Sequence, residues 1–189
     1  MRRSRIFTLT LLFSYCEASA SSAFPVPDYL VFQSRAYVGW AALGVGYSFW
    51  DKKLDVGLMY GYVPKSLGGH KIHSLTLKNS ISAPTLSWRD LSLRTASFGI
   101  SSIYSPDQAL FFFSPSQYPI RNYYPPTAVR HAFWLGTDIR WRGNPKNPGI
   151  GLFVEFAVLD ADLISYFDNY PLFHISQFVS SGVGIVLDF

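Results

Sequence analysis

Apolar side chains occupy every second position in much of this chain, and this alternation constrains the fold more than any other feature. In the segment 54–62, LDVGLMYGY, aliphatic and aromatic residues hold the even positions, and mainly small or acidic residues hold the odd ones. Successive side chains of a β-strand point to opposite faces, whereas a helix would place neither set on one side. The pattern therefore predicts a strand with one broad apolar face.

The same alternation recurs along the chain and predicts about eight strands. They cover residues 29–35, 36–50, 54–62, 70–79, 94–104, 132–141, 149–160 and 175–189. No segment has the pattern of a long amphipathic helix, and no apolar run reaches the roughly 18 to 20 residues that a membrane-spanning helix needs. The alternation thus favours an all-β fold.

The face opposite the apolar one is unusual, because it consists largely of glycine, alanine and serine with isolated charges of both signs. The charged members are Asp55, Lys78, Asp138, Arg140 and Glu155. A soluble β-sandwich would carry more lysine and glutamate on a solvated face. Small residues with a few charges suit the interior of a narrow barrel whose apolar face points at lipid. We therefore expect a closed, antiparallel, up-and-down transmembrane β-barrel of about eight strands, with a secreted, soluble, lipocalin-like binding barrel as the alternative.

The connections between the predicted strands also favour a bacterial outer-membrane barrel, in which periplasmic turns are short and external loops are long. If the last strand ends at the periplasmic rim, the periplasmic connections are 51–53, 81–93 and 142–149, and the external ones are 64–69, 105–131 and 166–172. Segment 81–93 is long for a periplasmic turn. Five aromatic residues lie at strand ends, where amphipathic rings favour the membrane–water interface: Trp50, Tyr60, Tyr62, Tyr104 and Trp141.

The first twenty residues have the layout of a secretory signal peptide. A basic start is followed by a short apolar run and by the small residues ASA at 18–20, which form a cleavage pattern. We predict cleavage after this pattern, which leaves residues 21–189 as one barrel domain. Cleavage also removes Cys16, the only cysteine, so neither a disulfide nor thiolate chemistry is expected.

Two groups of residues are candidates for function, and neither identifies a cofactor or a nucleic-acid partner. The five interior charges could line an ion path, but an eight-stranded barrel is just wide enough for side chains to fill it. We therefore expect them to pair and plug the interior. The external segment 105–131 contains several aromatic residues and includes Arg121, Tyr123, Tyr124 and Arg130. Such a set could contact lipid chains and lipopolysaccharide phosphates, or the loop could pack on itself and cap the barrel.

Two pairs of residues bear on catalytic and metal chemistry. Hydrolase chemistry needs a nucleophile and a base within hydrogen-bond reach, and His174 and Ser176 share one face of the last predicted strand. They define the alternative of a lipid-modifying acyl hydrolase at the external rim. His70 and His73 lie three positions apart on a predicted strand and so face opposite sides, which argues against a metal site. No cofactor is expected.

Two segments resemble the central strands of small outer-membrane barrels, namely GYSFWDKKLDVGLMYGY and HKIHSLTLKN. Among such barrels, the chain most resembles the lipid A 3-O-deacylases. The resemblance implies an eight-stranded barrel. It also implies a catalytic His-x-Ser near the end of the penultimate strand, where this chain has Val158 and Asp160, whereas His174 and Ser176 come one strand later. The resemblance therefore supports the fold and argues against the acyl-hydrolase activity of that family.

The segment SSGVGIVLDF resembles the C-terminal signature of proteins that the bacterial barrel-assembly machinery folds, with apolar residues at alternate positions before a final Phe. The matching residues are Val183, Ile185, Leu187 and Phe189. Together with the signal peptide, this resemblance implies the outer membrane of a Gram-negative bacterium. The expected function is that of an integral outer-membrane barrel with a structural or surface-binding role and no catalysis. Its expected partners are outer-membrane lipid and lipopolysaccharide, and the assembly machinery during biogenesis.

Overall fold

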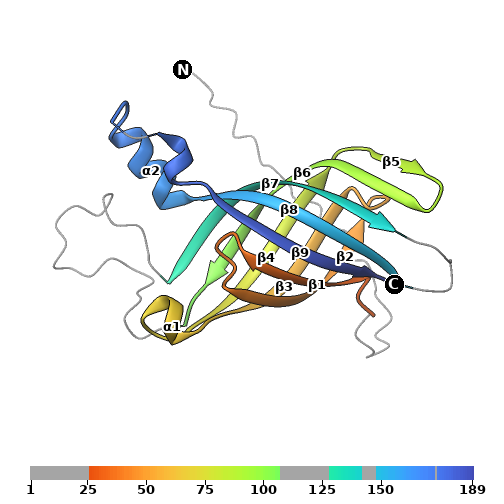
Figure 1. Cartoon of the computed structure of the whole chain (residues 1–189), viewed down its shortest axis with the longest axis horizontal. Helices are drawn as coiled ribbons and strands as arrows, with labels where there is room; N and C mark the ends of the chain where they lie inside the picture. The colour runs from red at the N-terminus through yellow and green to blue at the C-terminus, as the bar shows by residue number, and fades with distance from the viewer. Residues whose placement is uncertain (1–25, 107–127, 142–147, 173) are drawn as a thin grey trace, which may run out of the picture.

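The computed structural model describes residues 26–106, 128–141, 148–172 and 174–189, and antiparallel strands dominate these ranges (Figure 1). The strands are β1 (Tyr29–Arg35), β2 (Ala41–Phe49), β3 (Leu54–Val63), β4 (Ile72–Ser82), β5 (Thr85–Trp88), β6 (Leu91–Tyr104), β7 (Val129–Trp141), β8 (Gly149–Leu159) and β9 (Ser180–Asp188). The helices are α1 (Lys65–Gly68), α2 (Asp160–Asp168) and the 3₁₀-helix η1 (Ile175–Gln177). Within the described residues, no helix is long and apolar enough to cross a membrane.

Eight of the nine strands form a closed barrel. Strands that follow one another pair from β1 to β4 and from β6 to β9, β9 pairs with β1, and the pairing of β4 with β6 closes the ring. All of these pairs are antiparallel. The expected all-β, up-and-down, closed barrel of eight strands is thus confirmed.

The small and polar face of each strand lines the interior of the barrel, and the apolar face lies outside. In β3, Asp55, Met59 and Gly61 are buried, whereas Leu58 and Tyr60 are about half exposed. The same alternation of buried and exposed positions runs along β2, β4, β7, β8 and β9. The core of the molecule is therefore the space that the strands enclose.

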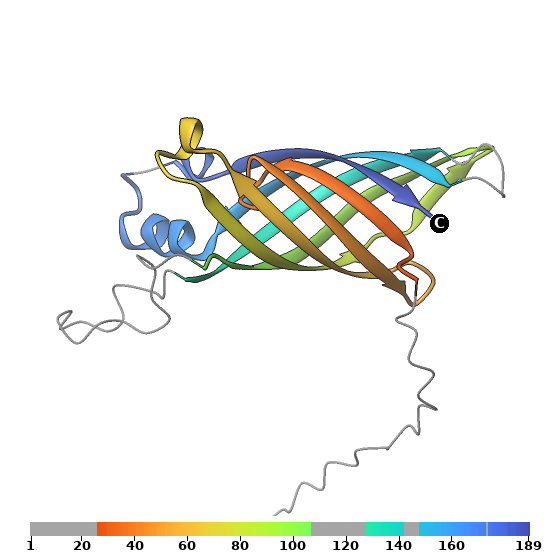
Figure 2. The ribbon, with the colours of Figure 1, turned by 90° about the horizontal axis from the view of Figure 1, so that it is seen from below.

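The two ends of the barrel carry different connections (Figure 2). The end that we call the helix end carries α1, α2, η1 and the turn between β1 and β2. The opposite end, the hairpin end, carries the β2–β3 turn and the β5–β6 turn, and β9 also ends there. This division agrees with the two groups of connections expected from the sequence.

One of those connections is a strand pair rather than a loop. In the segment 81–93, β4 continues to Ser82, and β5 and β6 then form a hairpin whose turn contains Arg89 and Asp90. The backbone of Arg89 has a φ of +52°. Pro84 separates β4 from β5 because it has no N–H for the strand ladder. The hairpin explains why this segment is long for a turn.

A second difference concerns the connection between β8 and β9. Residues 160–168, which overlap the expected external loop, form α2 and contact β7 and β8. The last strand begins at Ser180 and not near residue 175, because η1 occupies 175–177. A nine-residue helix is too short to form by propensity alone, so its contacts with the barrel stabilise it.

Candidate functional site in the barrel interior

A chain of alternating charges crosses the interior near the hairpin end. The Arg94 guanidinium lies 2.5 Å from Asp55 Oδ2 and 3.3 Å from Asp138 Oδ2. The Arg140 guanidinium lies 2.6 Å from Asp138 Oδ1 and 2.7 Å from Asp188 Oδ1. These residues come from β3, β6, β7 and β9, so the chain links strands that are far apart in the sequence.

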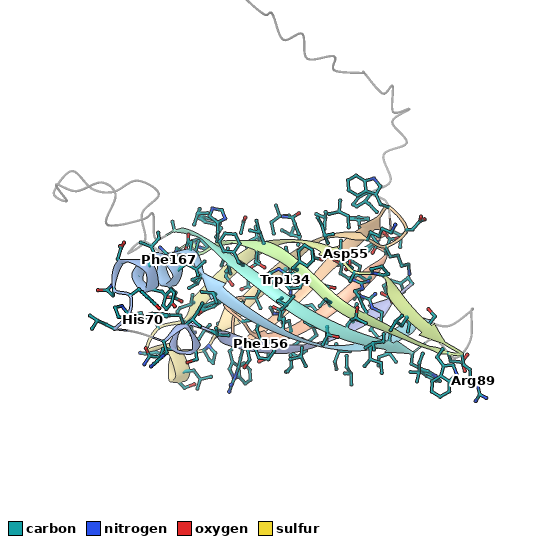
Figure 3. All side chains as sticks on the ribbon, turned by 90° about the horizontal axis from the view of Figure 1, so that it is seen from above. Asp55, His70, Arg89, Trp134, Phe156 and Phe167 are labelled. Carbon is teal, nitrogen blue, oxygen red and sulfur yellow. The ribbon has the colours of Figure 1, made fainter. Side chains whose placement is uncertain are left out.

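A second polar group lies at mid-barrel. Lys78 Nζ donates to Glu155 Oε2 and, at 2.9 Å, to Gln33 Oε1, while Gln33 Nε2 donates to Glu155 Oε1. Lys78 Nζ also lies 4.4 Å from the ring centroid of Trp134, within the range of a cation–π contact. Figure 3 labels Trp134 and Asp55 among the strands of the barrel.

These interior charges balance one another closely. Seven charged side chains take part, which are Asp55, Lys78, Arg94, Asp138, Arg140, Glu155 and Asp188. Each has an ion-pair partner of opposite sign, as burial in a low-dielectric interior requires. Four of the five ion pairs join different strands, and the fifth joins Asp138 and Arg140, which lie two positions apart on β7.

The helix end of the interior is apolar instead. The β1–β2 turn folds into the barrel, so that Val38 is 0% and Ala36 2% exposed. Val38 packs with Met59 and neighbouring interior residues. Gly61 admits this turn, since a Cβ at that position would lie 1.7 Å from the carbonyl oxygen of Val38. Ser74 Oγ donates to the same carbonyl at 2.9 Å.

Tyr37 links this inward turn to the β8–β9 connection through hydrogen bonds. Its hydroxyl lies 2.9 Å from Asp162 Oδ2 and 2.8 Å from the carbonyl oxygen of Phe178. Burial, and then the hydrogen bond to the Asp162 carboxylate, raise the pKa of the Tyr37 phenol. Asp160 pairs with Arg130 at 3.1 Å, so α2 is held over the helix end from both sides.

Two hollows lie along the polar part of the barrel, one in the interior and one that opens at the hairpin end. One of about 80 Å³ lies between the charge chain and the mid-barrel group, and its lining includes Arg94, Trp134 and Glu155. The other, of about 410 Å³, lies at the hairpin end, and its lining includes Arg94, Arg89 and Trp141. Arg94, Asp138 and Arg140 line both cavities, so the two lie next to each other. The polar interior is therefore approached from the hairpin end, and the packed turn closes the helix end.

The structure brings the five sequence-predicted interior charges into these two groups, and it adds three partners. The additions are Arg94, Asp188 and Gln33. Arg94 precedes a register irregularity between residues 94 and 97, which breaks the simple alternation there. Asp188 shares the inward register of Gly184 in the last strand and could have been recognised from that spacing.

The sequence-predicted pair His174 and Ser176 does not lie on a strand. His174 precedes η1, Ser176 lies within η1, and both side chains are exposed at the helix end. Residues two apart in a 3₁₀-helix point in different directions, so the expectation of a shared strand face was wrong. Among the described residues, no hydrogen bond joins the two side chains, and no group of three or more His, Cys, Asp or Glu side chains could hold a metal ion.

The other sequence-predicted residues are placed only in part. Arg121, Tyr123, Tyr124 and the predicted signal peptide lie outside the described residues. Arg130 is the second residue of β7 and pairs with Asp160. The residues of the expected assembly signal point outward and are exposed, and they are Val183, Ile185, Leu187 and Phe189.

An apolar belt surrounds the barrel on the outside. Every barrel strand contributes exposed apolar side chains to it, namely Phe32, Leu43, Val45, Leu58, Leu75, Leu77, Phe98, Ile100, Phe133, Leu135, Leu152, Phe156, Val183 and Ile185. Exposed tryptophans Trp50, Trp88 and Trp141 lie toward the hairpin end, and Trp40, Tyr60 and Tyr104 lie toward the helix end. The barrel thus has a polar core and an apolar surface.

In comparisons with known proteins, the chain matches no protein-family model, no curated protein and no solved structure.

Proposed function

We propose that this protein is an integral barrel of the bacterial outer membrane with a structural or surface-binding role. The observation that carries the proposal is the distribution of side chains, which is the inverse of that in a soluble protein. Paired charges fill the interior, while the apolar belt runs around all eight barrel strands. Hydrocarbon accepts a strand structure only when it closes on itself and shows an apolar outer face.

The belt supports a lipid environment more strongly than an aqueous one. Soluble monomers rarely expose a contiguous apolar patch larger than a few hundred Å², whereas every barrel strand contributes exposed apolar side chains to this belt. The barrel strands are 7 to 14 residues long, and this spread includes the roughly 9 to 11 residues that cross a bilayer. The exposed aromatic residues at both ends suit the two membrane interfaces.

The proposed orientation places the helix end outside the cell and the hairpin end in the periplasm. Outer-membrane barrels carry their longer connections outside, and the helix end carries α1, α2 and η1. In this orientation, lipopolysaccharide would surround the helix end, and the barrel-assembly machinery would act during biogenesis from the periplasm.

The paired interior charges favour a structural or surface role over transport. Side chains of an eight-stranded barrel occupy its lumen, and here ion pairs hold them in place. The likeness to lipid A 3-O-deacylases extends this proposal to a shared architecture. It does not extend to activity, because the corresponding positions in β8 and just after it hold Val158 and Asp160. Unchanged lipid A profiles on overexpression of the wild type and of Ser176→Ala would agree with that exclusion.

Membrane fractionation combined with a denaturing gel tests the proposal. We expect the full chain to fractionate with outer membranes and to need detergent for extraction. Without boiling it should migrate faster than after boiling, because a closed barrel resists the detergent. Extraction by salt or carbonate alone would instead support a soluble binding barrel.

A further inference from the structure

A group of basic residues at the helix end has no carboxylate near it in the sequence. Lys65, His70, Lys71 and His73 are exposed and follow one another around the β3–β4 connection, and we call them the β3–β4 basic patch. Between Asp55 and Asp90 the chain contains no aspartate or glutamate. Among the described residues, none of the four forms an ion pair. Figure 3 shows His70 at this end of the molecule.

The basic patch begins where the apolar belt stops. His73 points outward from β4, two positions before the belt residue Leu75. Its Nδ1 lies 2.5 Å from the Tyr60 hydroxyl, and its ring centroid lies 5.2 Å from that of Tyr62. These contacts fix the imidazole and occupy one ring nitrogen, which leaves Nε2 for a partner outside the barrel.

Among the described residues, most other cations near the two ends of the barrel have acidic neighbours, and Arg35 at the end of β1 is an exception. Arg130 at the helix end pairs with Asp160. At the hairpin end, Lys52 and Lys53 follow Asp51, and Arg89 precedes Asp90. The basic patch therefore gathers four basic residues without the acidic neighbours that Arg130, Lys52, Lys53 and Arg89 have. Its position is that of lipid headgroups when the belt lies in hydrocarbon.

We infer that the β3–β4 basic patch binds the phosphate groups of the lipids that surround the helix end. The inference rests on the proposed function, because only a barrel in a bilayer brings headgroups to this height. A lysine near an anionic lipid surface gains attraction that falls off within a Debye length. The Tyr60–His73 contact adds a hydrogen-bonding ring beside the two lysines.

Native mass spectrometry of the full chain in neutral-detergent micelles tests the inference. The probes are phosphatidylglycerol and phosphatidylcholine with identical acyl chains, so that they differ only in the headgroup, which is anionic in the first and zwitterionic in the second. We expect the wild type to retain phosphatidylglycerol about tenfold more tightly than phosphatidylcholine. The variant Lys65→Gln/His70→Gln/Lys71→Gln/His73→Gln should lose most of that preference, and Lys65→Gln/Lys71→Gln, which keeps the histidine contact, should lose part of it.

A matched variant at the hairpin end, Lys52→Gln/Lys53→Gln/Arg89→Gln, removes a similar charge from the opposite rim and should keep the preference within about twofold of the wild type. Equal loss in both multiple variants would overturn the inference, as would an unchanged preference in the patch variants. Displacement of the lipid by millimolar inorganic phosphate would show a free-anion site and overturn the assignment to lipid. The gel shift of each protein is read separately, so a barrel that still shifts but shows no lipid preference refutes this inference and leaves the proposed function standing.

Discussion

The mid-barrel ion pair shows how single residues hold the interior together. Glu155 is buried and Lys78 is largely buried, with side chains 3% and 14% exposed, and their hydrogen bonds include Gln33. Loss of one partner leaves the other charge without compensation in a low-dielectric space, which typically costs about 3–5 kcal/mol. Replacement of both partners by neutral side chains costs much less, because no unpaired charge remains.

We therefore expect Glu155→Gln to lower the free energy of unfolding by about 3 kcal/mol. Urea titration in micelles, followed by the gel shift, measures this change. The double variant Lys78→Met/Glu155→Gln should recover a large part of the loss. A single variant as stable as the wild type would contradict the role of this pair.

Gly61 is a second residue on which the interior depends, because a Cβ there would lie 1.7 Å from the Val38 carbonyl oxygen. We expect Gly61→Ala to push the β1–β2 turn out of the barrel and to lower stability by about 1–3 kcal/mol, measured in the same titration. Gly57→Ala is the control, since the nearest atom there is the Tyr29 hydroxyl at 3.0 Å. Equal effects of the two substitutions would mean that the turn does not depend on this close approach.

At the scale of elements, Tyr37 joins the β1–β2 turn to α2 and to the segment before β9. Tyr37→Phe removes the hydroxyl and should lower stability near pH 8 by about 1 kcal/mol. The raised pKa of Tyr37 gives this contribution a pH dependence. It is fully present below about pH 10, the ordinary tyrosine pKa, and is lost above it, because the unfolded chain ionises first.

Unfolding titrations between pH 8 and 11 check this expectation. The difference in stability between the wild type and Tyr37→Phe should shrink as the pH rises. Parallel curves across this range would show that the hydroxyl does not link the two elements.

The sequence could predict the elements that period-two alternation defines, but not those that depend on tertiary contacts. Eight strands and their inward faces follow from residues such as Gly57 and Leu58 in β3. Pro84 interrupts the alternation, so the pattern does not predict the β5–β6 hairpin. α2 has acidic residues in its first turn that favour a helix N-terminus, but it is too short for its helical pattern to be recognised. The contacts of Tyr37 and Arg130 that hold α2 in place join positions more than 25 residues apart along the chain.

The same reasoning explains how much of the interior site was accessible from the sequence. Isolated charges such as Asp138 and Glu155 stood out because their neighbours on the same face are small. Their pairing could not be predicted, since partners such as Arg94 and Asp55 lie on strands that only barrel closure brings together.

At the scale of the whole molecule, the apolar belt separates a membrane barrel from a soluble one. Leu135 in the belt and Leu67 in α1 are similarly exposed, at 54% and 62%. If both positions faced water, arginine at either one would have little effect on the free energy of unfolding. In lipid, Leu135→Arg should cost about 2–4 kcal/mol, whereas Leu67→Arg should cost almost nothing. Folding titrations in vesicles measure both values, and equal values would argue for a water-exposed belt.

The central claim, that the outer face lies in lipid, is tested most directly by spin labels on the folded full chain in vesicles. Labels are attached in a Cys16→Ser background at Phe133→Cys, Leu135→Cys and Ile139→Cys, and at Leu67→Cys for comparison. We expect the three β7 labels to collide more with oxygen, which is enriched in hydrocarbon, than with a water-soluble nickel chelate, and the Leu67 label to show the reverse. β7 labels as accessible to the chelate as the Leu67 label would contradict a membrane-spanning barrel.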